Sequence, residues 1–390
     1  MPGVWLPTLL VGDDPFQSGK DLLMQVQVGL RQCSHLWSGG HVDERLVHLV
    51  DTTSLPLVAP TGFVSPPYDS GLVNLPLTSG TPSLSSETAV IEVVRHIVGT
   101  HTVVRVNHWH VRRENYVVAS VETQQPALRL IVKLEVPGER PNRHLDAMAA
   151  IARLVRSQTS VPTFDVVAVD STRQQWPWEY LVVTELAGLT WMELYPRLHR
   201  GAREGGQRQI GRAAGQLHAL RFESFGQIGP DGSVIDGTAV LPALRRRAQQ
   251  RLTKPRHLAV MLETLETHKD LFAGLSTPTL CHEDLNPNNL VFTIRDGQPE
   301  LVGILDFESA WANTGESDLA RLEFWWMMAG TAIRQGYSDV AAVTAEYMMR
   351  RPLLQLLWCL EYAEHHASAE HQALTNGVCA ELGLPEIQLG

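Results

Sequence analysis

Paired cysteines and long apolar runs are missing from this sequence. The four cysteines lie far apart and form no Cys-x-x-Cys pair, which favours neither a structural zinc site nor a disulfide framework. No window of about 18 apolar residues is present, so we expect no membrane span. Met1 to Leu10 contains no basic segment and no cleavage site, so we expect no signal peptide. A reducing, cytoplasmic compartment fits this composition.

Positive charge is also limited. The 390 residues include 32 Lys and Arg against 42 Asp and Glu, which gives a formal net charge of −10. This balance argues against nucleic acid as the main partner and is neutral towards a cationic substrate. Lysine occurs only at Lys20, Lys133, Lys254 and Lys269. In such a background a retained lysine can supply a compact point charge that arginine does not reproduce.

The first 86 residues are the least regular part of the sequence. Residues 1–51 are expected to form an N-terminal extension of unknown role, with one short helical pattern from Asp21 to Arg31. Gly12, Gly19 and Lys20 do not have the G-x-x-x-x-G-K-[ST] spacing of a phosphate-binding loop. Residues 52–86 are rich in Pro, Ser, Thr and Gly and are predicted to be a linker.

The most informative stretch runs from Leu280 to Phe292, where a polar loop separates two apolar runs. Asp284 and Asn289 lie in the loop, and Asp306 ends a later apolar run. Oxygen ligands of this kind suit Mg²⁺ on a nucleotide, with Asn289 and Asp306 as metal ligands. Asp284 is then free to orient a hydroxyl and accept its proton, and His282 would brace the loop. A lone Asp-x-x-x-x-Asn more often forms a turn, but this ordered set between apolar strands is far more specific.

These motifs resemble the aminoglycoside phosphotransferase family of small-molecule kinases. The quoted segments are His-Glu-Asp-Leu-Asn-Pro-Asn-Asn-Leu-Val, then Gly-Ile-Leu-Asp-Phe-Glu, then Ser-Asp-Leu-Ala. Two glycines of the family's usual loop pattern are Glu283 and Asn288 here, and glycine reaches positive φ more easily than either. The resemblance covers about residues 87–380. It implies an α+β, two-lobed protein-kinase-like fold, with a small antiparallel sheet lobe and a mainly helical lobe.

The resemblance also divides the chain. It implies a nucleotide-binding N-lobe over residues 87–187 and a catalytic and substrate-binding C-lobe over residues 188–390. Hydrophobic periodicity predicts the main elements of both lobes. The expected helices are 87–98 (capped by Ser86), 144–157, 207–220, two within 241–272, 316–328, 352–371 and 372–382, and the expected strands include 102–106, 116–121, 128–134, 166–169 and 180–184.

Further roles in the nucleotide site follow from the resemblance. Lys133, inside an apolar strand, would steady the α and β phosphates of ATP, although a lysine facing water at a sheet edge is the alternative. Asp146 is the acid of the following helix and the candidate partner of Lys133, while a favourable position near the helix dipole also explains it. Backbone groups of Thr184 and Leu186 would bind the adenine edge. Asp318 would support the catalytic loop.

Two groups of charged side chains have alternative interpretations. The hairpin between the first two predicted strands contains no glycine, and its Arg112 and Arg113 would either contact phosphate or lie at a solvated tip. Near the C-terminus, Glu361, Glu364 and Glu370 would either line a site for a cationic substrate or form a solvated helix face. The solvated alternative is the more common one for such helix acids.

The sequence therefore predicts an ATP- and Mg²⁺-dependent phosphotransferase that moves the γ-phosphoryl group to a small-molecule hydroxyl. The acceptor would be an aminoglycoside-like antibiotic, a sugar or an amino alcohol, and the pattern leaves ATP against GTP and the oligomeric state open. The alternative is a nucleotide-binding pseudokinase or scaffold, suggested by the glycine-free hairpin and the N-terminal segment. Protein substrates are disfavoured, because no long activation loop ending in Ala-Pro-Glu lies between Asp306 and Asp318.

Overall fold

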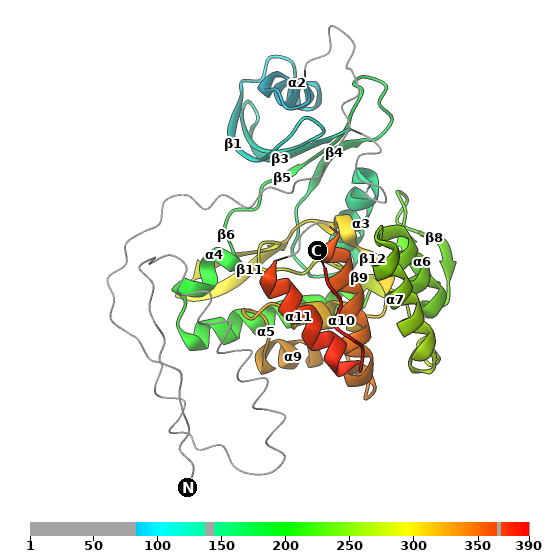
Figure 1. The fold of residues 1–390 in the computed structure, drawn as a ribbon. Helices are drawn as coiled ribbons and strands as arrows, with labels where there is room; N and C mark the ends of the chain where they lie inside the picture. The colour runs from blue at the N-terminus through cyan, green and yellow to red at the C-terminus, as the bar shows by residue number, and fades with distance from the viewer. Residues whose placement is uncertain (1–82, 137–143, 365–367, 390) are drawn as a thin grey trace, which may run out of the picture. The chain divides into compact units, whose positions relative to one another are not determined.

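A computed structural model of the protein describes residues 83–136, 144–364 and 368–389 (Figure 1). The N-terminal extension, its short helical pattern and nearly all of the predicted linker lie outside the described residues. Among the helices that the structure describes, none is both long and apolar enough to span a membrane.

A five-stranded antiparallel sheet of order β1-β2-β3-β5-β4 forms the N-terminal lobe. Its strands are β1 (Val104–Arg112), β2 (Tyr116–Gln124), β3 (Ala127–Glu135), β4 (Val166–Asp170) and β5 (Glu179–Thr184). Helix α2 (Glu87–Val98) covers one face of this sheet (Figure 1). Ser86 caps α2 by accepting a hydrogen bond of 3.1 Å from the N–H of Ala89, so this predicted helix and its cap are confirmed.

The period-2 alternation of strand side chains gives the sheet two different faces. Alternate apolar residues of β2 and β3, such as Ala119 and Val132, pack with α2 in a core of their own. The residues between them point to the opposite face. There the uninterrupted β2–β3 register sets Val118 beside Lys133 and Ser120 beside Ile131. Lys133 is therefore an inner residue of a central strand, and the edge-strand alternative is wrong.

Two small sheets and the helices after β5 form the second lobe. The sheets have the orders β11-β10-β6 and β8-β7-β12-β9. Their strands are β6 (Leu189–Thr190), β7 (Phe225–Ile228), β8 (Val234–Thr238), β9 (Thr279–Cys281), β10 (Leu290–Arg295), β11 (Gln298–Ile304) and β12 (Trp311–Asn313). Helix α3 (Leu145–Gln158) precedes β4 and packs against β4 and β5. The helices of the second lobe are α4 (Trp191–Leu194), α5 (Arg200–Leu217), α6 (Val240–Arg251), α7 (Pro255–Thr267), α8 (Glu316–Leu322), α9 (Thr331–Ser338), α10 (Tyr347–Ala363) and α11 (Ala369–Glu381), with 3₁₀ turns η2 (Tyr195–Arg197), η3 (Lys269–Phe272) and η4 (Phe307–Ser309).

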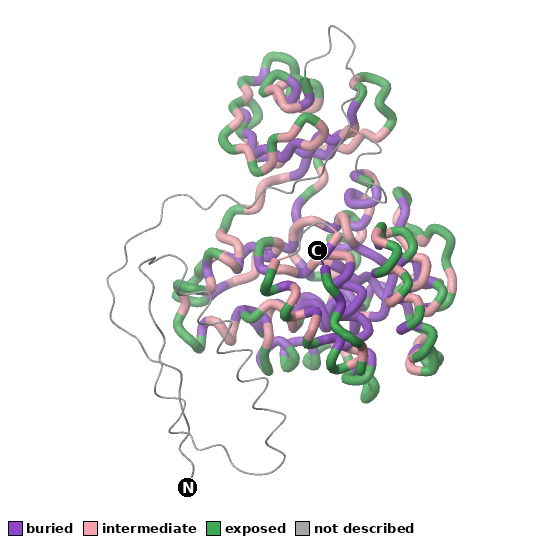
Figure 2. Tube along the Cα trace, in the orientation of Figure 1, coloured by how far each residue is buried: buried purple, intermediate pink, exposed green. Residues whose placement is uncertain are grey.

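The large core surrounds the strands that carry the polar loop. Helix α10 is buried along most of its length within this core (Figure 2). The backbones of α5 and α9 touch where both carry glycine. A Cβ at Gly211 would lie 2.1 Å from the carbonyl oxygen of Ile333, and a Cβ at Gly336 would lie 2.1 Å from that of Arg208. Both glycines are therefore required for the close approach of the two helices.

Several predicted helix ends differ from the structure. Pro352 was expected at the start of a helix, but α10 begins at Tyr347, because Tyr347 and Arg350 are buried and extend the helix backward. The same helix was expected to reach residue 371, yet it ends at Ala363. A new helix, α11, begins at Ala369 after the Ser368 cap. The predicted 316–328 helix ends at Leu322.

Candidate active site

The polar loop between β9 and β10 is fixed by His282, which is fully buried. The Nε2 of His282 donates to the carbonyl oxygen of Leu305 at 2.8 Å. Its Nδ1 accepts from the backbone N–H of Asp284 at 3.2 Å. Because one ring nitrogen must donate and the other must accept, the arrangement selects the neutral Nε2–H tautomer. The histidine ties the loop to the end of β11, the strand that leads to Asp306.

Two amide side chains hold Asp284 within the loop. Asn286 donates to Asp284 Oδ1 at 3.1 Å, and Asn289 donates to Oδ2 at 3.2 Å and to the Asp284 carbonyl at 2.9 Å. Both carboxylate oxygens are therefore oriented before any ligand arrives. Burial raises the pKa of Asp284 from its usual value, because desolvation disfavours the charged form.

Asp306 lies next to Asn289 although the two are 17 positions apart in the sequence. The N–H of Leu305 donates to the carbonyl of Asn289 at 2.8 Å, which joins the two segments. Asp306 adopts a left-handed conformation, with φ of 62° and ψ of 69°, between β11 and η4. Strain of this kind in a non-glycine residue is often retained at functional sites.

The donor atoms at this point fit a hard divalent cation. The Nδ2 of Asn289 is engaged with Asp284, which leaves its Oδ1 as an acceptor. Asp306 Oδ1 accepts from Lys133, and in the described part of the chain no hydrogen bond engages Asp306 Oδ2. One amide oxygen and one carboxylate oxygen are ligands of the type that Mg²⁺ takes in nucleotide sites.

Lys133 reaches this group from β3. Its Nζ lies 2.9 Å from Asp306 Oδ1 and 2.8 Å from Glu308 Oε1. Burial of Lys133 disfavours its charge, but the carboxylates of Asp306 and Glu308 outweigh it and hold the lysine pKa well above its usual range. Glu308 is a site residue that the sequence reading missed. Its signal was the second acid in Asp306-Phe307-Glu308.

The expected pairing of Asp146 with Lys133 does not occur in the structure. Asp146 lies in the first turn of α3, and its Oδ1 accepts from the N–H of Ala147 at 2.8 Å. Helix α3 instead contacts the lysine through Met148, whose sulfur is 3.7 Å from Nζ. The sequence assigned the contact with Lys133 to position 146, two positions before the residue that makes it. The alternative explanation of Asp146, a favourable position near the helix dipole, fits its surroundings.

The segment after β5 connects the two lobes beside this group. Thr184 exchanges two hydrogen bonds of 2.9 Å with Asp165, one through its N–H and one through its Oγ1. Leu186 packs on β11, since a Cβ at Gly303 would lie 1.9 Å from the Leu186 Cδ1. Between them, Glu185 accepts from the Ser120 hydroxyl at 3.0 Å. Of the two predicted adenine-binding residues, Leu186 therefore packs against the strand that leads to Asp306, whereas Thr184 ends β5 and is paired with Asp165.

Of the two hairpin arginines, Arg112 has partners other than a phosphate in this structure. Its Nε donates to the Ser85 carbonyl at 2.9 Å, and its guanidinium lies 4.4 Å from the centre of the Trp109 ring. These contacts tie the hairpin to the segment before α2.

Asp318 supports the loop between β9 and β10 through both of its carboxylate oxygens. Oδ2 accepts from the His282 N–H at 2.8 Å and from His218 Nε2 at 3.0 Å, and Oδ1 accepts from the Glu283 N–H at 2.8 Å. Burial opposes the charge of Asp318, but its hydrogen bond to His218 and the neighbouring donors hold its pKa below the usual value. His218 is the buried C-terminal cap of α5, and its Nδ1 accepts from Tyr337 at 2.9 Å.

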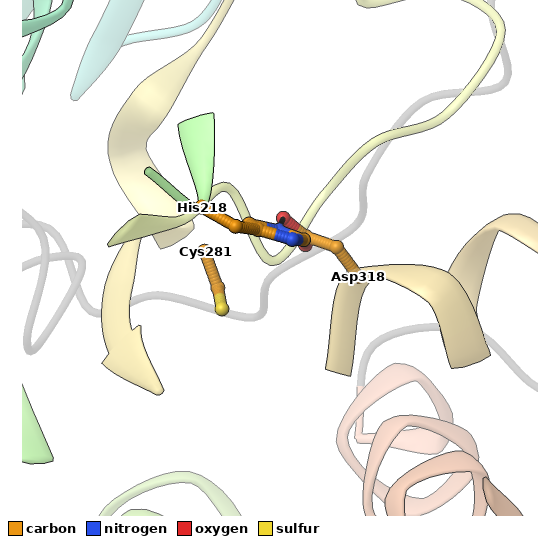
Figure 3. A group of neighbouring side chains, drawn as sticks. All are labelled: His218, Cys281 and Asp318. Atoms are coloured by element: carbon orange, nitrogen blue, oxygen red, sulfur yellow. Dashed lines mark hydrogen bonds and ion pairs between the residues drawn. The ribbon is translucent and has the colours of Figure 1, made fainter. Parts of the chain in front are cut away.

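His218, Cys281 and Asp318 also form a trio of metal-ligand residue types (Figure 3). Their ligand atoms lie within 4.8 Å of one another. However, N–H groups already occupy the Asp318 oxygens, and the Cys281 thiol donates to the Thr314 carbonyl at 3.1 Å. Burial raises the pKa of Cys281 well above its usual value, so its thiol stays protonated. The trio therefore braces the loop rather than binding a metal.

Glu283, at one of the family's glycine positions, adopts φ of 63°. Its side chain enters a buried ionic cluster, which we define as Glu283, Arg247, Arg321, Arg251 and Glu361. Glu283 Oε2 lies 2.8 Å from Arg247 and 3.3 Å from Arg321, while Glu361 contacts all three arginines. Both sequence interpretations of Glu361 are therefore wrong, since its side chain is neither solvated nor available to a cation.

Glu364 is likewise buried and paired. It accepts from the Thr253 hydroxyl, and one carboxylate oxygen lies 3.2 Å from His257 Nδ1. Only Glu370, in the first turn of α11, is exposed as a solvated face requires.

The ionic cluster predicts an acid-sensitive contribution to stability. Burial opposes the charge of Glu361, but Arg247 and Arg251 outweigh it and hold its pKa far below the usual value. A lowered folded-state pKa stabilises the protein above the unfolded value, and this stability is lost as the pH falls through the folded value. We expect the free energy of unfolding to decline below about pH 5, and Glu361→Gln to flatten that decline. Urea unfolding at several pH values checks this, with Glu370→Gln as the control that should leave the slope unchanged. An equal slope in Glu361→Gln contradicts it.

Comparison with known proteins identifies the family. A family model described as the phosphotransferase enzyme family (APH) matches residues 110–350, which is more than half of the chain. The chain belongs to this family. The family prediction is thereby confirmed, and as an APH member the chain is a small-molecule kinase.

Solved structures agree with the APH assignment in fold. Aminoglycoside phosphotransferase APH(4)-Ia has a TM-score of 0.55 at 14% identity, with 76% of this chain and 98% of that chain covered. A provisionally assigned fructosamine-3-kinase from Thermobifida fusca YX-ER1 has a TM-score of 0.53 at 20% identity, with 76% and 100% covered. A thermostable APH(4)-Ia mutant was solved with ADP and hygromycin B, at a TM-score of 0.52, 14% identity and coverage of 75% and 97%. The predicted two-lobed protein-kinase-like fold is confirmed.

Proposed function

We propose that the protein transfers the γ-phosphoryl group of ATP to a hydroxyl of a small molecule. The observation that carries this proposal is the meeting of Asp284, Asn289, Asp306 and Lys133 from three separate segments at bonding distances. A solved neighbour of the same fold holds ADP together with hygromycin B. That precedent supports a nucleotide and a small hydroxylated acceptor, either antibiotic-like, a sugar or an amino alcohol.

Each side chain has a defined task in this reaction. Lys133 steadies the phosphates, while Asn289 and Asp306 would hold Mg²⁺, which would neutralise charge on the phosphate oxygens. Asp284 orients the acceptor hydroxyl, whose oxygen forms a bond to the γ-phosphorus as the bond to the β-bridging oxygen breaks. The hydroxyl proton passes to Asp284, and ADP leaves.

The remaining predicted residues keep supporting roles in the proposal. Backbone groups of Thr184 and Leu186 bind the adenine edge, whereas His282 and Asp318 fix the loop. We assign nucleotide binding to residues 87–187 and catalysis with acceptor binding to residues 188–390. Because the loop is oriented in advance by its own hydrogen bonds, most of the rate enhancement would come from positioning and charge stabilisation.

Nucleotide-dependent thermal stability tests this function. A ligand that binds only the folded state adds about 2.7 kcal/mol when its concentration is about 100 times its Kd. We expect Mg-ATP to raise the unfolding midpoint more than ATP alone. Asp306→Ala should lose this metal-dependent difference, because the variant lacks one of the two metal ligands.

Asp339→Ala, which removes an exposed carboxylate paired with Arg212 at 2.7 Å, is the matched control and should respond as the wild type does. No shift of the wild type at millimolar Mg-ATP contradicts the proposal. A shift without ATP consumption on any hydroxyl acceptor favours the pseudokinase alternative.

A further inference from the structure

Lys133 is held by two carboxylates from one short segment, and these carboxylates differ in their surroundings. The side chain of Asp306 is 35% exposed, whereas that of Glu308 is only 3% exposed. Glu308 Oε1 accepts from Lys133 at 2.8 Å and from the hydroxyl of Tyr116 at 3.3 Å. A carboxylate buried to this extent depends on a charged partner, and Lys133 supplies it.

Helix α3 contributes no acidic partner to Lys133. It contacts the lysine through the sulfur of Met148, at 3.7 Å from Nζ. Met148 is itself buried, and its side chain fills the position from which a helix carboxylate would reach the lysine. In the residues that the structure describes, both ion pairs of Lys133 therefore come from the Asp306–Glu308 segment.

The carboxylates of Asp306 and Glu308 cannot both keep their contact with Lys133 during the reaction. In the proposed function Asp306 turns to a metal ion and Lys133 to the phosphates, which weakens their mutual contact. Glu308 is not a metal ligand in the proposed function and keeps its contact with Nζ. A fixed acid beside a phosphate-binding lysine limits the rotation of its ammonium group.

We propose that Glu308 is the positioning residue of the nucleotide site, holding Lys133 toward the phosphates in place of an acid on α3. This inference rests on the proposed function and deepens it. Because Asp306 is the N-cap of the 3₁₀ turn that contains Glu308, the metal ligand and the residue that holds the lysine are placed together. The position of Lys133 relative to the phosphates then depends on the segment that contains Asp306 and Glu308, and not on the position of α3.

The test removes the carboxylate at position 308 and then introduces one at position 148 on α3. Glu308→Gln keeps the side-chain shape and removes the charge. Losing one charge-assisted hydrogen bond in a buried site is expected to weaken binding of Mg-AMP-PNP about 10–100-fold, as measured by calorimetry. With ATP and a hydroxyl acceptor, the KM for ATP should rise more than kcat falls, since Lys133 contacts the bound nucleotide throughout. The double variant Glu308→Gln/Met148→Glu returns an acid to Lys133 from α3 and should recover most of the affinity.

Glu266→Gln is the matched control, because it neutralises a surface glutamate that pairs with Lys269 at 2.8 Å. Its affinity for Mg-AMP-PNP should equal that of the wild type. Should Glu308→Gln fail to fold, Glu308→Asp keeps the buried charge, retracts it by one methylene and should weaken binding in the same direction.

The outcomes separate this inference from the proposed function. If the wild type does not bind Mg-AMP-PNP, the proposed function fails. If the wild type binds and Glu308→Gln binds equally well, the positioning role of Glu308 is overturned while the proposed function stands. A folded double variant that remains as weak as Glu308→Gln also overturns the role, because a merely structural defect would not be repaired by an acid on another helix.

Discussion

Asp284→Asn is expected to lower phosphoryl transfer by about 10²–10⁴-fold, the range that a positioned general base contributes. Asparagine has nearly the same shape but accepts no proton, and its amide nitrogen would face the amide donors of Asn286 and Asn289. Binding of Mg-ATP should change little, because Asp284 acts on the acceptor hydroxyl. The measurements are single-turnover transfer and the thermal shift with Mg-ATP.

The pH dependence of the same reaction follows from burial. The proton-accepting form of Asp284 is the carboxylate, and burial raises its pKa. The rate should therefore begin to fall at a higher pH than for an ordinary aspartate as the solution is acidified. Asp339→Asn makes the same chemical change at an exposed ion pair and should retain full activity. Comparable transfer rates in Asp284→Asn and the wild type would show that another group receives the proton.

Glu283→Gly is expected to destabilise the protein by about 1–4 kcal/mol, although it restores the residue type that the family usually has. Two effects oppose each other. Relieving the left-handed conformation at φ of 63° gains roughly 1–2 kcal/mol. Removing one partner from a buried ion pair costs about 3–5 kcal/mol, because Arg247 and Arg321 then share a single remaining carboxylate. The electrostatic loss is the larger effect, and urea unfolding measures the difference.

Asn288→Gly is the control for this prediction. Asn288 occupies the family's second glycine position, is exposed, and is not among the described residues with positive φ. The change removes no charge and relieves no strain, so we expect less than about 1 kcal/mol of destabilisation, from backbone entropy. A Glu283→Gly protein at least as stable as the wild type would mean that the ionic cluster does not compensate for the strained backbone.

The cluster also explains how this chain tolerates glutamate where glycine is common. The N–H of Glu283 is bonded to Asp318, and its carboxylate accepts from Asn313 at 2.9 Å in addition to its ion pairs. Contacts on both sides of the residue thus determine its backbone conformation. From the sequence, a glutamate at a glycine position leaves the backbone geometry of the loop undetermined. The structure shows that Arg247 on α6 and Arg321 on α8 hold this glutamate in place.

Local sequence alone determined a large part of this protein. The spacing of His282, Asp284, Asn289 and Asp306 between apolar runs indicated the family, and periodicity with the Ser86 cap defined α2 to the residue. These features rest on contacts within one turn or between adjacent strands, where local sequence carries the information. The family and the two-lobed fold followed from them.

Tertiary structure decided what depends on segments distant in the chain. Only the fold shows that Lys133 pairs with Glu308, 175 residues away, and that α3 turns Met148 instead of Asp146 toward it. Glu361 likewise reads as a solvated helix acid until the fold brings three arginines around it. A charged side chain is stable in the interior only beside its partner, and the choice of partner is made by packing and not by sequence neighbours.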